Sequence, residues 1–277
     1  MHTSQLHANP SQPLRGPKVK AATLFNKVPE ITVWFWIIKV LCTTVGETAS
    51  DFLQSPDNGG LGLGIPKTFA IMGTLLAIAL VMQMRLNRYR PVSYWVAVVL
   101  ISIVGTLVTD WLHDDKGVTL VTTTIIFSSV LAAVFGIWYA IERTLSIHSV
   151  YKGRREAFYW LVVLATFALG TSAGDLLAEQ TGLGYFASVM VVAGAIALIA
   201  FARFVLNANA VLTFWMAYIL TRPLGGNTGD WISLSDPDLG GLGLGTTATS
   251  LIFLGVIAAV VTYLTVTRKD VIEEHGG

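Results

Sequence analysis

Long uncharged stretches alternate with short polar segments along most of this chain. Seven stretches contain no Asp, Glu, Lys or Arg, and each reaches about the ~17–25 residues that an α-helix needs to cross a ~30 Å hydrocarbon layer. An eighth stretch, Ile31–Asp51, has a similar length but contains Lys39 and Glu47. The seven uncharged stretches are Thr68–Met84, Pro91–Thr109, Val118–Ile141, Ala157–Gly174, Gln180–Ala202, Phe204–Thr221 and Leu239–Thr267.

These stretches predict helices rather than the strands of a membrane barrel. Barrel strands alternate apolar and polar residues, and the stretches do not. Lipid offers backbone N–H and C=O groups no partner, so an apolar span must satisfy them internally. We therefore predict an all-α integral membrane protein with eight transmembrane helices over residues 30–267. Residues 1–29 are expected to be a disordered cytoplasmic tail, and residues 268–277 a second cytoplasmic tail.

Composition agrees with this prediction. Hydrophobic residues make up 53% of the 277 residues and charged residues 13%, about half the charged fraction of a soluble domain. The formal net charge of +1 gives no reason to expect nucleic acid as a partner. A single cysteine, Cys42, cannot form an internal disulfide bond.

Basic residues are concentrated on one side of the predicted spans. Fourteen Lys and Arg residues fall in the loops and tails of one side, and only Lys67 and Lys116 in those of the other. Basic residues in short loops mark the cytoplasmic side. The pattern therefore places both termini in the cytoplasm, and we expect a multi-pass protein of the bacterial inner (cytoplasmic) membrane.

A short motif recurs four times and divides the chain into tandem repeats. Each copy has the form W-x9-G-x4-D, and its aspartates are 59, 65 and 55 residues apart, about one helical hairpin. Every repeat contains two spans, so all four enter the membrane with the same polarity as parallel repeats. The repeats cover about 30–88, 89–152, 153–207 and 208–267. The four copies are Trp36–Gly46–Asp51, Trp95–Gly105–Asp110, Trp160–Gly170–Asp175 and Trp215–Gly225–Asp230.

With this motif, the chain resembles a family of bacterial membrane proteins with four tandem two-span repeats and a marker tryptophan, a repeat of unknown function. The resemblance runs from Trp34 to about Val266 and covers nearly all of the chain beyond the first tail. It implies the eight-helix architecture and identifies Trp36, Trp95, Trp160 and Trp215 as the marker tryptophans. It implies no activity.

Helical periodicity places the polar residues of each odd span on one face. At about 100° per residue, positions 15, 8, 4 and 0 before the aspartate fall within a sector of about 80°. We therefore predict that the four odd helices lie inside with these faces together, and that the four even helices lie outside. The faces read Trp36, Thr43, Glu47, Asp51; Trp95, Ser102, Thr106, Asp110; Trp160, Phe167, Thr171, Asp175; and Trp215, Arg222, Gly226, Asp230.

Carboxylates on these faces form a candidate cation site. Ionisable residues at membrane depth are costly and usually mark a function. Oxygen ligands favour hard or borderline cations such as Mg²⁺ or Mn²⁺, or protons, so a divalent cation is expected as a substrate and no cofactor is expected. The predicted metal ligands are Glu47, Asp51, Asp110, Asp175 and Asp230. The predicted substrate-binding residues add Arg222, Thr43, Thr106, Thr171, Asn227, Trp36, Trp95, Trp160 and Trp215.

Each of these features also has a purely structural interpretation. The aspartates could be solvated residues at the membrane surface or caps of the following loop. Arg222 could form a buried salt bridge with Asp230 or Glu47 that only fixes its helix. The tryptophans could belong to an interfacial belt or form an aromatic floor below the polar faces. The glycine five residues before each aspartate is expected to serve close helix packing.

Two glycine-rich features bear on the path of the chain. Pro223 and the glycines that follow it are expected to break the seventh helix in mid-membrane, as in many transporter sites. The outer segments Gly60–Gly64 and Gly241–Gly245 could be short re-entrant segments or tight turns, and turns are preferred.

The leading interpretation is a secondary transporter of a cation, with efflux of a divalent metal coupled to protons or to the membrane potential. No phosphate-binding loop, nucleophile elbow or zinc-protease motif is present, so we do not expect an enzyme. The alternatives are a transporter of a small organic solute, a membrane enzyme acting on a lipid, and an accessory subunit without transport activity. The expected partners are the lipid bilayer and a cation or small-molecule substrate, and a homo-oligomer is an open possibility.

Overall fold

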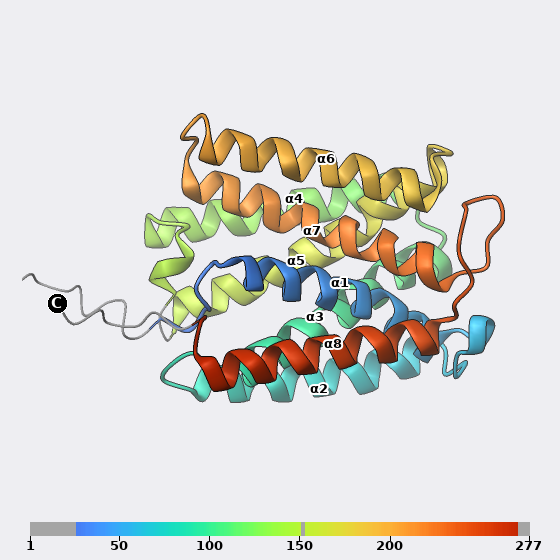
Figure 1. The fold of residues 1–277 in the computed structure, drawn as a ribbon, viewed down its shortest axis with the longest axis horizontal. Coiled ribbons are helices and arrows are strands. Elements are labelled where there is room, and N and C mark those ends of the chain that lie inside the picture. The colour runs from blue at the N-terminus through green and yellow to red at the C-terminus, as the bar shows by residue number, and fades with distance from the viewer. Residues whose placement is uncertain (1–25, 151–152, 271–277) are drawn as a thin grey trace, which may run out of the picture.

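The computed structural model describes residues 26–150 and 153–270, and this part of the chain is helical without strands. Eight long helices lie side by side (Figure 1). They are α1 (Val33–Gln54), α2 (Ile65–Arg85), α3 (Pro91–Asp110), α4 (Leu120–Glu142), α5 (Arg154–Asp175), α6 (Gly184–Phe204), α7 (Ala210–Ser233) and α8 (Thr246–Thr267).

Six of these helices are long and apolar enough to cross a membrane, which confirms the prediction of a helical membrane protein. The other two, α1 and α7, are 22 and 24 residues long, so at ~1.5 Å per residue they have the same reach. Both contain charged residues, among them Glu47 and Arg222, and these charged residues are buried inside the bundle. The charges therefore lower the mean hydropathy of the two helices without exposing charge on their outer faces.

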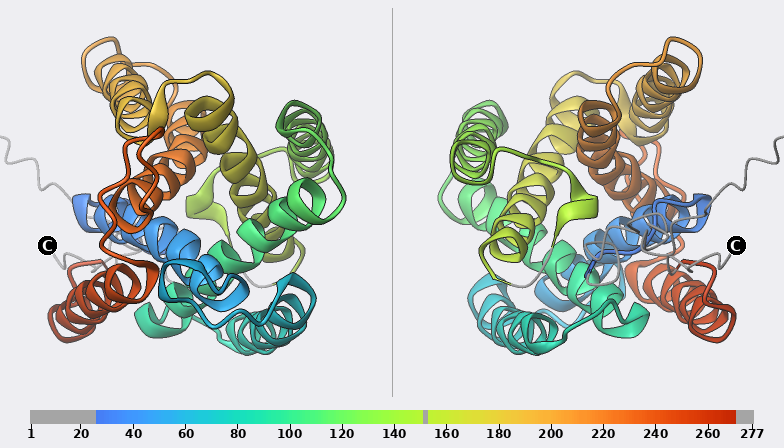
Figure 2. Two further views of the ribbon diagram at one scale, coloured as in Figure 1. Left: turned by 90° about the vertical axis from the view of Figure 1, so that its right-hand side faces the viewer. Right: turned by 90° about the vertical axis from the view of Figure 1, so that its left-hand side faces the viewer.

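Burial divides the helices into an inner and an outer set. In the apolar windows of α3 and α5, 67% and 61% of the residues are buried, against 17%, 22%, 17% and 28% in α2, α4, α6 and α8. Long runs of buried residues also occur in α1 and α7. Viewed along the bundle, the four even helices lie at its periphery around the four odd ones (Figure 2). The outer surface of the even helices is apolar, as a lipid-facing surface requires.

The inner helices form a closed ring in the order α1, α3, α5, α7. Each outer helix packs mainly on the inner helix of the following repeat: α2 on α3, α4 on α5, α6 on α7, and α8 back on α1. By contrast, α1 makes only slight contact with α2, the second helix of its own repeat. The ring therefore depends on the first repeat receiving the last.

The four motif glycines bring neighbouring inner helices into close contact. A Cβ atom on any of them would lie under 3.0 Å from a residue of the next inner helix, closer than real Cβ atoms come. In every case that residue stands eight positions before the aspartate of the next repeat. The glycines thus serve close packing, as in other membrane helix pairs. The four contacts are Gly46 with Ser102, Gly105 with Phe167, Gly170 with Arg222 and Gly225 with Thr43.

The predicted break in the seventh helix is wrong, because α7 continues through Pro223 to Ser233. The Pro223 ring packs against the bare backbone of Gly170 and Gly174 on α5, where a Cβ atom would lie 3.1 Å and 3.3 Å from the proline. Tight packing against a neighbouring helix lets a membrane helix tolerate a proline. The two glycines on α5 provide the space that the ring needs.

The two outer glycine-rich segments are neither re-entrant helices nor simple turns. Leu61, Gly62, Leu63 and Gly64 donate backbone hydrogen bonds to the carbonyls of residues 52–55, at the end of α1. Leu242 to Gly245 do the same for carbonyls 231–234 at the end of α7. These carbonyls have no partner within their own helix, and the segments supply it. Gly62 and Gly243 adopt φ angles of 64° and 69°, a conformation that glycine reaches without strain.

The ordered chain begins before the first long helix. Residues 26–29, which the sequence assigned to the tail, are buried. The Lys27 ammonium lies 2.5 Å from a Glu156 carboxylate oxygen and donates hydrogen bonds to the carbonyls of Gln83 and Met84. Residues 1–25 and 271–277, the rest of the two predicted tails, lie outside the described residues.

Candidate cation site

Carboxylates gather in a cavity of about 170 Å³ at the end of the bundle where the inner helices finish. We call this end the acidic end, the opposite end the basic end, and the hollow the acidic cavity. All five predicted metal ligands line it, together with two further acidic residues. The lining residues are Glu47, Asp51, Gln54, Asp110, His113, Asp114, Asp175, Glu179, Tyr185, Asp230 and Leu234.

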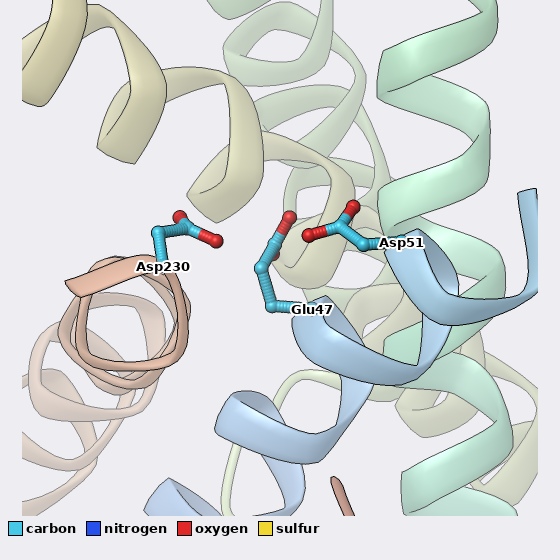
Figure 3. A group of neighbouring side chains, drawn as sticks. All are labelled: Glu47, Asp51 and Asp230. Atoms are coloured by element: carbon cyan, nitrogen blue, oxygen red, sulfur yellow. The ribbon is translucent and has the colours of Figure 1, made fainter. Parts of the chain in front are cut away.

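Three of these carboxylates form a compact group. Glu47 and Asp51 lie one turn apart on α1, and Asp230 faces them from α7 (Figure 3). One carboxylate oxygen of each lies within 4.8 Å of the other two. Oxygen ligands bind Mg²⁺ at about 2.0–2.1 Å and Ca²⁺ at about 2.3–2.6 Å, so ligands across one ion stand about 4–5 Å apart. The three side chains therefore have the spacing that a single divalent cation needs.

The remaining two motif aspartates end their helices. Asp110 is the last residue of α3 and Asp175 the last of α5, and each is followed by one π-helical turn. The Gln54 amide donates a 2.6 Å hydrogen bond to Asp110 and a 3.5 Å one to Asp51. Gln54 thus links the aspartates of the first and second repeats. The caps expected as an alternative role are not seen, since no backbone N–H of the described residues donates a hydrogen bond to the side-chain carboxylate of any of the four aspartates.

Arg222 closes the inner side of the cavity. Its Nη2 atom lies 2.5 Å from a Glu47 carboxylate oxygen and also donates to the Thr106 hydroxyl. Arg222 is fully buried, and its Nε and Nη1 atoms have no hydrogen-bond partner in the described part of the chain. Of the two partners that the sequence suggested, Glu47 is the one that it contacts. The pair joins the last repeat to the first and holds Glu47 at the bottom of the cavity.

Three other predicted polar residues donate hydrogen bonds to backbone carbonyls of the inner helices. Thr43 donates a 3.1 Å hydrogen bond to the Thr221 carbonyl across the α1–α7 contact. Asn227 donates to the Gly174 carbonyl at 3.4 Å across α5 and α7. Thr171 donates to the Phe167 carbonyl within its own helix. None of the three lines the acidic cavity.

The four tryptophans lie at the basic end, away from the acidic cavity. Trp95, Trp160 and Trp215 are buried, and Trp36 is half-buried. The residue before each tryptophan is aromatic, and its ring contacts the marker tryptophan of the next repeat. The ring centroids are 5.7 Å apart for Phe35–Trp95, 5.5 Å for Tyr94–Trp160, 6.3 Å for Tyr159–Trp215 and 5.6 Å for Phe214–Trp36.

We call these eight side chains the aromatic floor. They form a closed circle across the inner ring, so of the two roles considered for the tryptophans the structure favours the floor over an interfacial belt. Packing of this kind holds aromatic rings at 4.5–7 Å separations. The floor also separates the polar interior from the basic end.

Beyond the floor, Tyr89 connects the bundle to its C-terminal segment. Tyr89 lies in the loop before α3, and its hydroxyl donates a 2.6 Å hydrogen bond to Asp270, which follows α8. Burial, and then the neighbouring Asp270 carboxylate, raise the pKa of the Tyr89 phenol well above its usual value. Tyr89 is therefore a neutral hydrogen-bond donor at physiological pH.

Sequence reasoning missed several residues of the cavity and the floor. Gln54, His113, Asp114 and Glu179 follow the motif aspartates by three or four residues, and the helix or its π-helical turn carries them to the cavity. Spacing one turn past each aspartate would have found them. The aromatic residues before the tryptophans were equally visible, since each marker reads Phe-Trp or Tyr-Trp.

Taken together, eight helices in four matched pairs, with an acidic cavity at one end of the inner ring, define a repeat-built membrane protein of the helical class. The chain belongs to the family described as Repeat of Unknown Function (DUF347), whose model matches residues 34–89, 93–144, 158–209 and 213–270. These four matches confirm the predicted resemblance and the four tandem repeats. No curated protein and no solved structure matches the chain.

Proposed function

We propose that the protein is a secondary transporter that carries a divalent cation through the acidic cavity. In this proposal all eight long helices cross the bilayer, and the apolar faces of the even helices contact lipid. The substrate crosses unchanged, so no catalytic step is involved. The basic end faces the cytoplasm of a bacterial inner membrane because basic residues in short loops mark that side.

The observation that carries this proposal is the charge of the acidic cavity. Seven acidic side chains line it, and no Lys or Arg is among its lining residues. Arg222 lies below the cavity and is already paired with Glu47. Glu47 and Asp230 are buried, and the other five are partly buried or, for Asp114 and Glu179, exposed. Carboxylates this close together and partly removed from water cannot all remain charged without compensation. Protons or bound cations must supply that compensation, and exchange of one for the other is the basis of coupled transport.

The same geometry favours a hard divalent cation. The lining offers carboxylate oxygens and one amide, with no thiol and one imidazole, His113. Such oxygen ligands suit Mg²⁺ and Mn²⁺ better than soft metals. The cavity lies on the proposed outer side, above the aromatic floor, so release to the outside is the favoured direction. A cation would enter from the cytoplasm only when the floor opens.

Metal flux into liposomes tests this proposal. The purified protein is reconstituted and the entry of Mn²⁺, Mg²⁺ and Ca²⁺ is followed with an internal indicator dye. We expect Glu47→Gln, Asp51→Asn and Asp230→Asn each to lower the flux of the transported ion by about tenfold or more, since even groups that only support metal ligands matter by about 10–100-fold. Asp238→Asn is the matched control, because Asp238 is exposed at the same end and does not line the cavity.

Two results would contradict the proposal. One is the same flux in the three cavity variants as in the wild type. The other is the absence of flux for every ion tested, with the wild-type protein folded and inserted.

A second cavity favours the alternative of an organic solute. A hollow of about 740 Å³ opens at the basic end between α1, α6 and α7, and is lined mainly by apolar side chains, including Trp36 and Phe214. Its volume lies in the range of small-molecule pockets, about 300–1,000 Å³. Trp36→Ala would then reduce organic-solute flux and leave metal flux unchanged. The cation proposal expects no solute flux that depends on Trp36.

A further inference from the structure

Lys39 is a buried amine without a hydrogen-bond partner. It lies on α1 two turns below Glu47, is 1% exposed, and its Nζ atom contacts no acceptor among the described residues. Instead, Nζ lies 3.9 Å from the ring centre of Phe167 and 4.3 Å from that of Tyr218. An ammonium carries three donors and requires acceptors or a counter-charge, and two aromatic faces satisfy it only in part. The site can therefore hold the amine in either protonation state.

Lys39 can release its proton, whereas the neighbouring Arg222 cannot. Arg222 is held by Glu47 and Thr106, and a guanidinium does not lose its proton in proteins. The lysine amine does exchange its proton when buried, which is why lysines serve as bases. Both cations lie against the same ring, since Arg222 Cζ is 5.9 Å from the centre of Phe167. Lys39 is thus the cation of this pair that can give up its charge.

Buried phenols lie between Lys39 and the basic end. Tyr218, Tyr159 and Tyr94 are all fully buried. The Tyr159 and Tyr94 hydroxyls are hydrogen-bonded to each other, and the Tyr218 hydroxyl has no hydrogen-bond partner among the described residues. The Tyr94 ring lies 5.7 Å from that of Tyr89, whose hydroxyl reaches Asp270 at the basic end. We call these four residues the tyrosine column, and it crosses the aromatic floor that separates Lys39 from the basic end.

No carboxylate of the described residues contacts the Lys39 amine. The groups that interact with it electrostatically are Cys42 on its own helix and Arg222 on α7. The side chains in contact on α5 and α7 are Phe167 and Tyr218, and α3 carries only Tyr94 and Asp110 as titratable groups, near its two ends. On α8 the only titratable side chain is Tyr263, which packs on Trp34 at the basic end. The acidic cavity above Glu47 is therefore the main variable charge near Lys39.

We propose that Lys39 is the proton-carrying group of the transporter, loaded from the acidic end when the acidic cavity is empty and unloaded to the basic end when a cation occupies that cavity. This inference rests on the proposed cation transport and names its coupling ion. A proton adds to the amine lone pair when the cavity is empty and negative. A divalent cation in the cavity repels that proton, which leaves to the basic end past the phenols, so a proton moves inward as the cation moves outward. One proton on Lys39 thus alternates with one cation at Glu47, Asp51 and Asp230.

Proton release on Mn²⁺ binding tests this role. Mn²⁺ is added to purified protein in weakly buffered detergent solution, and the released protons are counted with a pH-sensitive dye. Metal binding releases protons from a protein. We expect Lys39→Met to release about one proton fewer per bound Mn²⁺ than the wild type, because the variant lacks the amine that gives up a proton. In liposomes the same variant should still exchange Mn²⁺ for Mn²⁺, but a pH gradient should no longer drive uptake. Lys67→Met, an exposed lysine on α2, is the control.

Lys39→Arg separates proton transfer from a structural role. Arginine keeps the positive charge and a similar length but holds its proton. If Lys39 carries the proton, Lys39→Arg shows the same loss of proton release and of coupling as Lys39→Met. If Lys39 only supplies packing or a fixed charge, Lys39→Arg behaves as the wild type, and the proposal is overturned. Should Lys39→Met fail to fold, the Lys39→Arg result alone decides.

The failure of this inference can be told from the failure of the proposed function. If the wild type transports Mn²⁺ and both Lys39 variants release as many protons as the wild type, Lys39 has no role in coupling. The acidic cavity remains the proposed cation site in that case. If the Glu47→Gln variant instead shows the same Mn²⁺ flux as the wild type, the acidic cavity itself has no role in transport.

Discussion

Single residues break the fourfold pattern of the inner ring at the site where function is proposed. At the position four before the aspartate, the repeats carry Glu47, Thr106, Thr171 and Gly226, and eight before it they carry Thr43, Ser102, Phe167 and Arg222. Thus only the first repeat has an acidic residue four positions before its aspartate, and only the last has an arginine eight positions before its aspartate. A repeat that served packing alone would have no need for either charge, because a buried ion pair rarely stabilises a fold more than apolar residues do.

The Arg222–Glu47 pair makes a prediction about stability. Arg222→Met removes the partner of a buried carboxylate, and we expect the free energy of unfolding to fall by about 3–5 kcal/mol. The double variant Arg222→Met with Glu47→Gln removes both charges, so it should recover part of this loss. Thermal unfolding in detergent measures the effect.

The control for this experiment is Arg154→Met. Arg154 is 79% exposed and pairs with Glu142 at 3.5 Å, so its loss should cost less than about 1 kcal/mol. Equal stability of Arg222→Met and Arg154→Met would show that the buried pair does not hold the inner ring together.

At the scale of the helix, the motif glycine sets how closely two inner helices approach. Gly225 shows this most clearly, since a Cβ atom there would lie 2.7 Å from the Val40 carbonyl oxygen as well as against Thr43. Backbone of an inner helix cannot move aside as the end of a long side chain can. The polar faces, and the carboxylates at their ends, can therefore meet only while this position is glycine.

Substitution of this glycine tests the role. We expect Gly225→Ala to lower the free energy of unfolding by about 1–3 kcal/mol, as overpacking of a close contact does. Gly136→Ala on the outer helix α4 is the matched control, because no atom lies within 4 Å of a Cβ there. Alanine favours a helix over glycine by about 0.5–1 kcal/mol, so the control should be unchanged or slightly more stable. Similar unfolding temperatures for the two variants would contradict close packing at Gly225.

Sequence predicted the helices better than their irregularities. The polar faces of the odd spans follow from a period of 3.6 residues, and α1, α3, α5 and α7 do carry these residues inward. Continuity of α7 could not be predicted, since it depends on the space that Gly170 and Gly174 leave on another helix. The capping of α1 and α7 by the outer glycine-rich segments depends in the same way on contacts that local sequence does not record.

At the scale of the whole molecule, the repeats form a circle rather than a row. Glycine contacts, aromatic contacts and outer-helix packing all run from each repeat to the next and from the fourth to the first. The four motif copies predicted equivalent helices, but loop lengths allow an outer helix to pack within its own repeat or on the next. Only the three-dimensional structure distinguishes these arrangements, and the acidic cavity is complete only when the circle closes.

Closure of the circle can be tested by cross-linking. The Thr48 hydroxyl on α1 and the Ser250 hydroxyl on α8 are 2.8 Å apart. In a Cys42→Ala background, Thr48→Cys with Ser250→Cys should form a disulfide under mild oxidation, because side chains this close meet the geometry of the bond. A protease site inserted after Lys116 would then yield fragments that separate only after reduction.

Ser250→Cys combined with Thr74→Cys is the control for the cross-link, since Thr74 lies exposed on α2. That pair should give fragments that separate without reduction. Free separation of the Thr48–Ser250 pair would show that the last repeat does not return to the first.

The most direct test of the cation site is to locate a bound ion. Crystals of the protein grown with Mn²⁺ allow the metal to be placed by its anomalous scattering. We expect one peak between the carboxylates of Glu47, Asp51 and Asp230, and its loss in Asp230→Asn crystals grown in the same way. A peak that persists in Asp230→Asn, or saturating Mn²⁺ with no peak in the acidic cavity, would contradict the account.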